Sequence, residues 1–232
     1  MGKKRAFSWR WRIAALLLLL ALGAGGWLWW QSRHWAPSRG EYPDQGVLIG
    51  EQDGEAGFAA LRAIGAQFAY LEASAGGSGR DARFAANIER VRDSGLSFGV
   101  VHAYDPCVPA ELQAANFVTI VPRDAGLLPP AIALDKLADK CPDPVSEAAV
   151  ESKLTTFLNQ VEGHVGKPAV LKVAPAFEAR YHVAGRIERN LWLTRDWWQP
   201  DYAGRPWTLW TANSSLRTAA GDRPVRWVVL QP

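Results

Sequence analysis

Residues that build metal centres are scarce in this sequence, which holds two cysteines and four histidines among 232 residues. No histidine clusters with Cys107 or Cys141 at the spacing of metal ligands, and two thiols alone make a poor metal site. Internal repeats are also lacking, as are low-complexity segments other than one run of leucines. These absences argue against a metal centre and a repeat architecture, and we predict no metal and no cofactor.

Acidic residues are missing from the first 35 positions, which hold six basic side chains. The remaining residues therefore carry 26 − 6 = 20 basic against 23 acidic side chains, a net charge of −3. The basic character of the whole chain, +3, belongs to its N-terminal segment. A fold so close to neutrality has no electrostatic footprint for nucleic acid, so we exclude nucleic acid as a partner.

The N-terminal segment has the pattern of a membrane signal. Residues 1–12 form a basic tail, and residues 13–30 are uncharged and apolar over nearly the length of a transmembrane helix. Positive charge before such a run keeps the N-terminus in the cytoplasm. We expect a single-pass anchor in the inner (plasma) membrane, with a cleaved signal peptide and a secreted product as the alternative. Both readings place residues 36–232 outside the cytoplasm, where a disulfide can persist.

Residues 31–45 are polar and contain proline and glycine, which is typical of a linker. Beyond them, short apolar runs alternate with amphipathic stretches. The runs predict strands at 46–50, 67–73, 97–103, 130–134, 169–173, 191–194, 207–211 and 225–230. Helical patterns lie between the first five strands, at 54–64, 81–94, 109–120 and 146–164. Such alternation favours an α/β fold with a parallel sheet and helices outside it.

Five segments in the same order resemble glycoside hydrolase family 25, the lysozyme-like muramidases that cut peptidoglycan. They are FAYLEAS at 68–74, DARFAAN at 81–87, GLSFGVVH at 95–102, ELQAANF at 111–117 and RPWTLW at 205–210. The resemblance covers residues 46–232. It implies an irregular (β/α) barrel of eight strands, the last three without crossover helices, and peptidoglycan or another cell-wall glycan as the partner.

The resemblance also extends to the two cysteines. Both follow predicted strand ends, and adjacent parallel strands would bring their loops together. Their positions resemble a cysteine pair in a proteobacterial branch of the family, which implies a disulfide between Cys107 and Cys141.

At nearly every position where the family has a catalytic or polar residue, this chain has a residue of a different type. The resemblance aligns the family's acids with Leu48, Ala75, Ala133 and Arg226, its fifth-strand tyrosine with Lys172, and a glutamine with Thr211. Glycosidases need two carboxyl groups near the scissile bond, or one acid and a substrate group. Asp135 is the remaining candidate general acid, and it requires an apolar strand end that raises its pKa. The sequence leaves open whether the chain is an enzyme.

Six further residues are candidates for substrate contact. We expect Glu72 and Lys172 to form a compensating ion pair inside the barrel mouth. His102 is kept from the family, although a lone histidine at a strand end is more often structural, and Tyr104 follows it. Trp197 and Trp198 lie in a predicted loop, where exposed indoles favour glycan or partner contact.

For five other residues we expect ordinary structural roles. Glu51 and Asp53 are predicted to be solvated loop residues, and Asp105 a turn residue. Trp207 and Trp210 are predicted to fill the barrel.

Three functions are compatible with this pattern. The first is a membrane-anchored, lysozyme-like domain that has lost most catalytic groups and binds cell-wall glycan or an envelope partner. The second is a weakly active muramidase that uses Asp135. The third is a membrane-tethered scaffold with a closed groove that binds protein.

Overall fold

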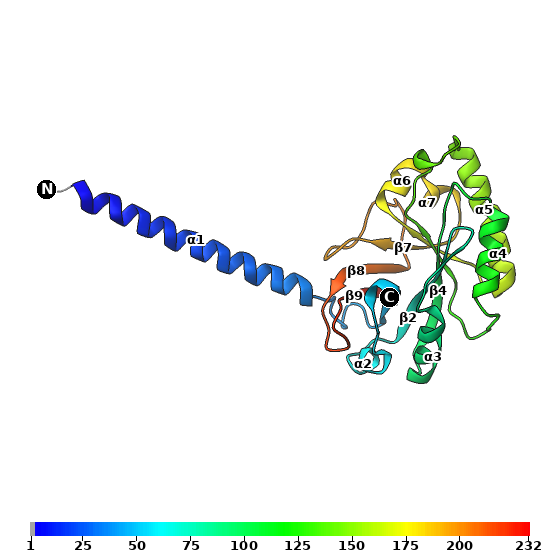
Figure 1. Ribbon diagram of the computed structural model, residues 1–232, viewed down its shortest axis with the longest axis horizontal. Helices are drawn as coiled ribbons and strands as arrows, with labels where there is room; N and C mark the ends of the chain where they lie inside the picture. The colour runs from blue at the N-terminus through cyan, green and yellow to red at the C-terminus, as the bar shows by residue number, and fades with distance from the viewer. Residues whose placement is uncertain (1–2) are drawn as a thin grey trace. The chain divides into compact units, whose positions relative to one another are not determined.

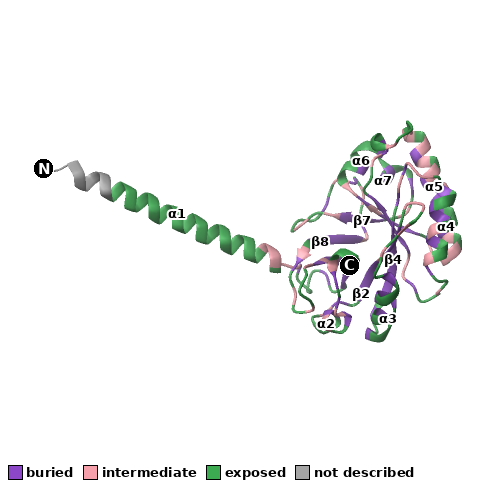
Figure 2. Ribbon diagram, viewed as in Figure 1, coloured by how far each residue is buried: buried purple, intermediate pink, exposed green. Residues whose placement is uncertain are grey.

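The computed structural model describes residues 3–232, with side chains described from residue 9 onward, and the chain forms two compact units, 1–35 and 36–232 (Figure 1). The first unit is the helix α1 (Lys3–His34). Within it, Trp9–His34 is long and apolar enough to cross a membrane, and its apolar side chains are exposed (Figure 2). A signal sequence near the N-terminus has the same properties, so the prediction of one apolar helix is confirmed while its cleavage stays open.

The second unit is a closed barrel. Eight strands follow one another in the order β1-β9-β8-β7-β6-β5-β4-β2, and β1 pairs with β2 to close the ring. The strands are β1 (Gln45–Ile49), β2 (Phe68–Ala75), β4 (Ser97–Ala103), β5 (Ala131–Leu134), β6 (Val170–Val173), β7 (Asn190–Thr194), β8 (Leu209–Leu216) and β9 (Val225–Leu230). Each overlaps a predicted strand, although the ends of several strands differ by a few residues, so the prediction of an eight-stranded barrel is confirmed.

The direction of the strands gives the barrel two distinct ends. All neighbouring pairs from β1 through β2 to β8 are parallel, whereas β9 is antiparallel to both β8 and β1. A short hairpin strand, β3 (Gly79–Arg80), pairs with the end of β2 and was not predicted. The parallel strands therefore end at one rim, where chemistry gathers in folds of this kind.

Helices connect the first six barrel strands, and the longer ones cover the outer side of the barrel (Figure 1). They are η1 (Glu51–Asp53), α2 (Phe58–Ala63), α3 (Phe84–Ser94), α4 (Ala110–Ile120), η2 (Ala138–Lys140), α5 (Glu147–Val165), α6 (Pro175–Tyr181) and α7 (Val183–Arg186). Ser146 caps α5 by accepting a hydrogen bond from the Ala149 amide, and Gly166 ends the helix in the left-handed conformation. Within the described residues, β7–β8 and β8–β9 are joined without a helix, as predicted.

The N-terminal segment of the second unit covers the outer wall of β8 and β9. Tyr42 is buried there against the rings of Trp207 and Trp210, with ring centroids 6.2 and 5.7 Å away. Leu209 belongs to the barrel interior, and because side chains alternate along a strand, Trp210 points outward. The prediction that Trp207 and Trp210 fill the barrel was therefore wrong; Trp192 lies inside instead, fully buried.

Part of the predicted linker belongs to this wall. The Gln45 side-chain amide donates to the carbonyl oxygens of Pro37 (3.0 Å) and Tyr42 (2.8 Å), and its oxygen accepts from Trp227 Nε1 (2.7 Å). Pro37 and Tyr42 are buried. The chain is thus fixed to the barrel within three residues of the end of α1.

Candidate active site at the carboxyl ends of the strands

An open cavity of about 310 Å³ lies at the rim where the parallel strands end. Every position that the resemblance aligns with an acid of the family lines it: Leu48, Ala75, Ala133 and Arg226. Its walls also carry seven charged side chains, namely Glu51, Glu72, Asp81, Asp135, Arg80, Lys172 and Arg226. The sequence alignment thus brought together positions that do meet in space.

Small side chains create the space in this cavity. Ala75, Ala103 and Ala133 are register partners on the neighbouring strands β2, β4 and β5, and Lys172 of β6 is the next partner in the row. The same alanines and Asp135 also line a second cavity of about 340 Å³, toward Asp105 and Lys136. The two cavities therefore adjoin one another at the barrel end, and together we call them the groove.

Arg226 is the centre of a buried ion cluster in the groove. Its Nη2 lies 2.7 Å from Asp53 Oδ2, and its Nη1 pairs with Glu72 Oε1. Asp53 also accepts a hydrogen bond from the Gly50 amide at 2.7 Å. The Asp53 side chain is only 8% exposed, so the expectation that it is solvated was wrong. A buried guanidinium needs such counterions, because removing it from water is costly.

Glu72 is held as a carboxylate by the same cluster. Burial by itself would raise its pKa, but the charge of Arg226, hydrogen bonds from Arg226 and Gln52, and the more distant charge of Lys172 together lower it. The Gln52 amide donates to Glu72 Oε2 at 2.8 Å. An acid with a lowered pKa is poorly suited to donate a proton near neutral pH.

The predicted direct pair between Glu72 and Lys172 is not formed. Glu72 pairs with Arg226, because β9 places that guanidinium beside β1 and the end of β2. Lys172 Nζ instead lies 3.8 Å from Asp135 Oδ2. The Asp135 side chain is 57% exposed, so it stands in solvent beside a cation and is not enclosed by apolar groups.

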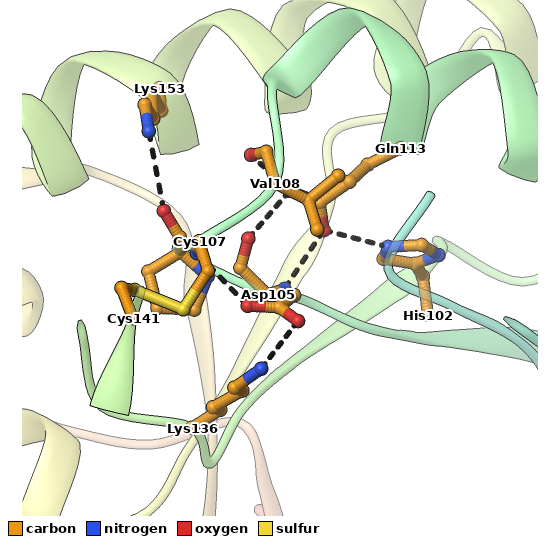
Figure 3. Close-up of polar contacts among 9 residues, drawn as sticks. His102, Asp105, Cys107, Val108, Gln113, Lys136, Cys141 and Lys153 are labelled. Carbon is orange, nitrogen blue, oxygen red and sulfur yellow. Dashed lines mark hydrogen bonds and ion pairs between the residues drawn. A yellow bond between two sulfur atoms is a disulfide. The ribbon is translucent and has the colours of Figure 1, made fainter. Parts of the chain in front are cut away.

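His102 faces away from the groove. Val101 and Ala103 line the cavity, so His102 between them points to the outer side of β4, where it is fully buried. Its Nδ1 is 2.8 Å from Ser74 Oγ. Its Nε2 is 3.3 Å from Gln113 Oε1, a contact drawn in Figure 3. Burial lowers its pKa to about 4, so the ring is neutral at neutral pH. His102 is therefore a structural residue, as a lone histidine at a strand end more often is, and it does not offer a substrate contact.

Tyr104 and Asp105 lie at the second cavity. The Tyr104 ring packs on Phe157 at 5.7 Å and is almost fully buried, which raises the pKa of its hydroxyl. Asp105 forms a turn with Val108, as expected, and it also pairs with Lys136 Nζ at 2.6 Å (Figure 3). The Cys107 amide donates to the same carboxylate at 2.9 Å, next to the disulfide.

Cys107 and Cys141 form a disulfide with a Cα–Cα distance of 5.1 Å (Figure 3). It joins the loops that follow β4 and β5, which confirms the bridge implied by the resemblance.

Comparison with known proteins decides the family. The model of glycosyl hydrolases family 25 matches residues 49–219, which is most of the barrel unit. The chain belongs to glycosyl hydrolase family 25.

Solved structures agree with the family 25 fold. A family 25 glycosyl hydrolase from Bacillus anthracis aligns with a TM-score of 0.77 and 22% identity, over 86% of this chain and 93% of that one. The bacterial lysozyme from Streptomyces coelicolor aligns with a TM-score of 0.72 and 18% identity, over 82% of this chain and 92% of that one.

Among curated proteins, the uncharacterized protein YegX from Escherichia coli K12 is 27% identical over 148 residues, which is 62% of this chain. The chain spans about half the length of that relative, 52%.

Two features of this family 25 site were not found from the sequence. Arg226 was recognised only as a replacement, because its partner Glu72 lies 154 residues away and no local pattern links them. Asp81 lines the groove and accepts hydrogen bonds from the amides of Glu51 (2.6 Å) and Arg83 (2.8 Å). Burial raises its pKa despite those bonds.

Trp197 and Trp198 lie in the loop between β7 and β8, with 44% and 69% of their surface exposed. Neither indole is among the described residues that line the groove.

Proposed function

We propose that this chain is a membrane-anchored family 25 domain that binds peptidoglycan glycan in its groove and has lost most of the hydrolytic activity of the family. The observation that carries the proposal is the composition of the groove. At the positions aligned with acids of the family it presents Leu48, Ala75, Ala133 and Arg226. A glycosidase requires a proton donor and a second carboxylate or substrate group at the scissile bond.

The remaining acids in the groove are poorly placed for proton donation. Glu72 is kept ionised by Arg226 and Gln52. Burial raises the pKa of Asp81, but both of its carboxylate oxygens accept backbone hydrogen bonds, which fix the side chain and favour its ionised form. Asp135 stands in solvent beside Lys172, whereas a general acid is tuned by an enclosed, apolar environment.

The shape of the groove supports glycan binding over a closed scaffold. It is open, it is made of two adjoining cavities, and it combines an alanine-lined wall with carboxylate and ammonium groups. Sugar chains offer apolar faces and many hydroxyl groups, and such a surface can contact both. We propose Lys172 and Glu72 as groove residues that contact the glycan, with the Glu72 carboxylate fixed by Arg226.

One observation favours the second candidate, a weak muramidase that uses Asp135. Asp135 lines both cavities and, two positions after Ala133, stands where the resemblance places the second acid of the family's Asp-x-Glu pair. Asp135→Asn removes the acid but keeps the size and the hydrogen-bonding capacity of the side chain, so it separates the two candidates.

The test uses the full chain in detergent micelles with purified peptidoglycan, and an active family 25 lysozyme as the positive control. New reducing ends are quantified by mass spectrometry, and binding is measured by co-sedimentation with the sacculi. We expect co-sedimentation without muropeptide release. Release that disappears in Asp135→Asn would establish the muramidase instead. Absence of both release and co-sedimentation would contradict glycan binding and support the scaffold.

A further inference from the structure

The loop between β7 and β8 presents two adjacent indoles to solvent, those of Trp197 and Trp198. Elsewhere in the described barrel unit, the exposed large apolar side chains are isolated aliphatic ones: Ile64, Leu112 and Val118. Isolated exposed aliphatic residues are normal on a protein surface, whereas a pair of exposed tryptophans marks a contact surface.

The loop is held in a conformation that few tryptophans adopt. Trp197 has a φ of 67°, in the left-handed region, and its amide donates to the Ala212 carbonyl at 2.8 Å. Asp196 accepts a hydrogen bond from the Ser214 amide at 2.8 Å, and Arg195 pairs with Asp201 at 2.8 Å. Left-handed backbone is unfavourable for a bulky residue and persists where its surroundings fix it. These contacts with β8 therefore hold the indole-bearing loop in place.

The loop that carries the indoles contacts, through Gln199, the segment that leads into the barrel from α1. Gln199, next to Trp198, donates from its side-chain amide to the Tyr42 hydroxyl. Gln45 in turn binds the carbonyls of Tyr42 and Pro37. Pro37 follows His34, the last residue of α1, by three positions, a connection of about 10 Å when fully extended.

We infer that Trp197 and Trp198 insert into the interfacial layer of the bilayer that holds α1, and so dock the barrel on the membrane surface. The inference rests on the anchoring proposed above. Tryptophan is enriched at the headgroup level of membranes, and α1 itself carries exposed indoles near its end, at Trp27, Trp29 and Trp30. Pro37, which is held against the barrel, follows the end of α1 by three residues in the sequence.

Charge argues that the contact is apolar. The loop segment 195–201 holds one basic residue, Arg195, and two acidic ones, Asp196 and Asp201, so it offers no attraction to anionic lipids. Binding to zwitterionic lipid is therefore expected, with little dependence on salt. Polybasic surfaces behave in the opposite way.

The test uses residues 36–232, which form a compact unit with their own core, and phosphatidylcholine vesicles that carry brominated acyl chains. Bromine quenches indoles that reach the bilayer. Of the six tryptophans in this unit, four are buried and two are Trp197 and Trp198, so quenching of up to about a third of the emission is expected. Trp198→Ser should weaken vesicle partitioning about tenfold, since an indole contributes a large apolar area.

Leu112→Ser is the matched control, because Leu112 is a comparably exposed apolar residue on α4, and it should leave partitioning unchanged. Wild-type protein that is not quenched by brominated lipid, or partitioning that requires anionic lipid and disappears in high salt, would overturn the inference. Peptidoglycan added in place of vesicles gives the competing outcome. Indole emission that responds to the glycan and not to lipid would assign the pair to glycan binding. Vesicle binding is measured without sacculi, so its result does not depend on whether the chain binds glycan as proposed.

Discussion

Arg226 and Lys172 are two cations in one groove, and they differ in how they are held. Arg226 is buried between Asp53 and Glu72 and contacts both. Lys172 is no more exposed, with 15% of its side chain accessible, but the ion pair described for it is with the solvent-exposed Asp135, at the longer distance of 3.8 Å. The first is part of the architecture of the barrel, while the second is the cation that we propose contacts the glycan. A charged side chain in a groove therefore indicates function only when its partners leave it available.

The largest effect is expected from Arg226→Met. The substitution keeps much of the length of the side chain but leaves the buried Asp53 and the partly exposed Glu72 without their cation, and breaking a buried pair costs about 3 kcal/mol or more. Urea denaturation followed by circular dichroism measures the loss. Arg195→Met, which breaks an exposed pair with Asp201, is the control and should cost at most about 1 kcal/mol. Equal losses in the two variants would show that the Arg226 cluster contributes no more than a surface pair.

Acid should reduce the difference between wild-type protein and Arg226→Met. The pKa of Glu72 is lowered in the fold, so its stabilising contribution is present above its ordinary pKa and is lost as the pH falls through the lower folded value. In the variant the cation is gone, and burial alone disfavours the carboxylate. We expect the two stability curves to converge below a pH of about 4.5. Parallel curves down to pH 3 would contradict the assignment.

His102 should produce a separate acid dependence at higher pH. Its folded pKa is about 4, below the ordinary value, because burial disfavours the charged ring. The unfolded chain therefore binds a proton first as the pH falls below about 6.5, and stability declines from there to about pH 4. His102→Gln should flatten this part of the curve and leave the part below it unchanged. A slope that persists in His102→Gln would assign it to another group.

Sequence patterns predicted the barrel better than the site for a physical reason. Strand periodicity is local, so every barrel strand was found, and alternation of side chains also explains why His102, between Val101 and Ala103, faces outward. Ion pairs in the groove join positions that are distant in the sequence, as Arg226 and Glu72 are. The local sequence around either residue does not indicate its partner. The row of alanines across β2, β4 and β5 became visible only with the strand register.

Lys172→Met tests the available cation. Its ammonium is expected to contact the glycan, and the loss of one hydrogen bond of about 1 kcal/mol corresponds to roughly fivefold weaker binding. Stability should change little, since the partner Asp135 is exposed. Co-sedimentation with sacculi at several protein concentrations measures the affinity. Lys140→Met removes an exposed lysine from η2, outside the described groove residues, and should bind like wild-type protein.

The smallest effect is expected from Asp135→Asn. The carboxylate is solvated and its distance from Lys172 is long for an ion pair, so the free energy of unfolding should change by less than about 0.5 kcal/mol. Glycan binding should be retained, because the amide keeps its hydrogen-bonding capacity and frees Lys172 from its acidic neighbour. Asp135→Asn should be compared with Lys172→Met. If the pair mattered only for the fold, removing either partner would change glycan binding in the same direction. Opposite effects on glycan binding would instead show that the ammonium itself contacts the sugar and that Asp135 competes for it.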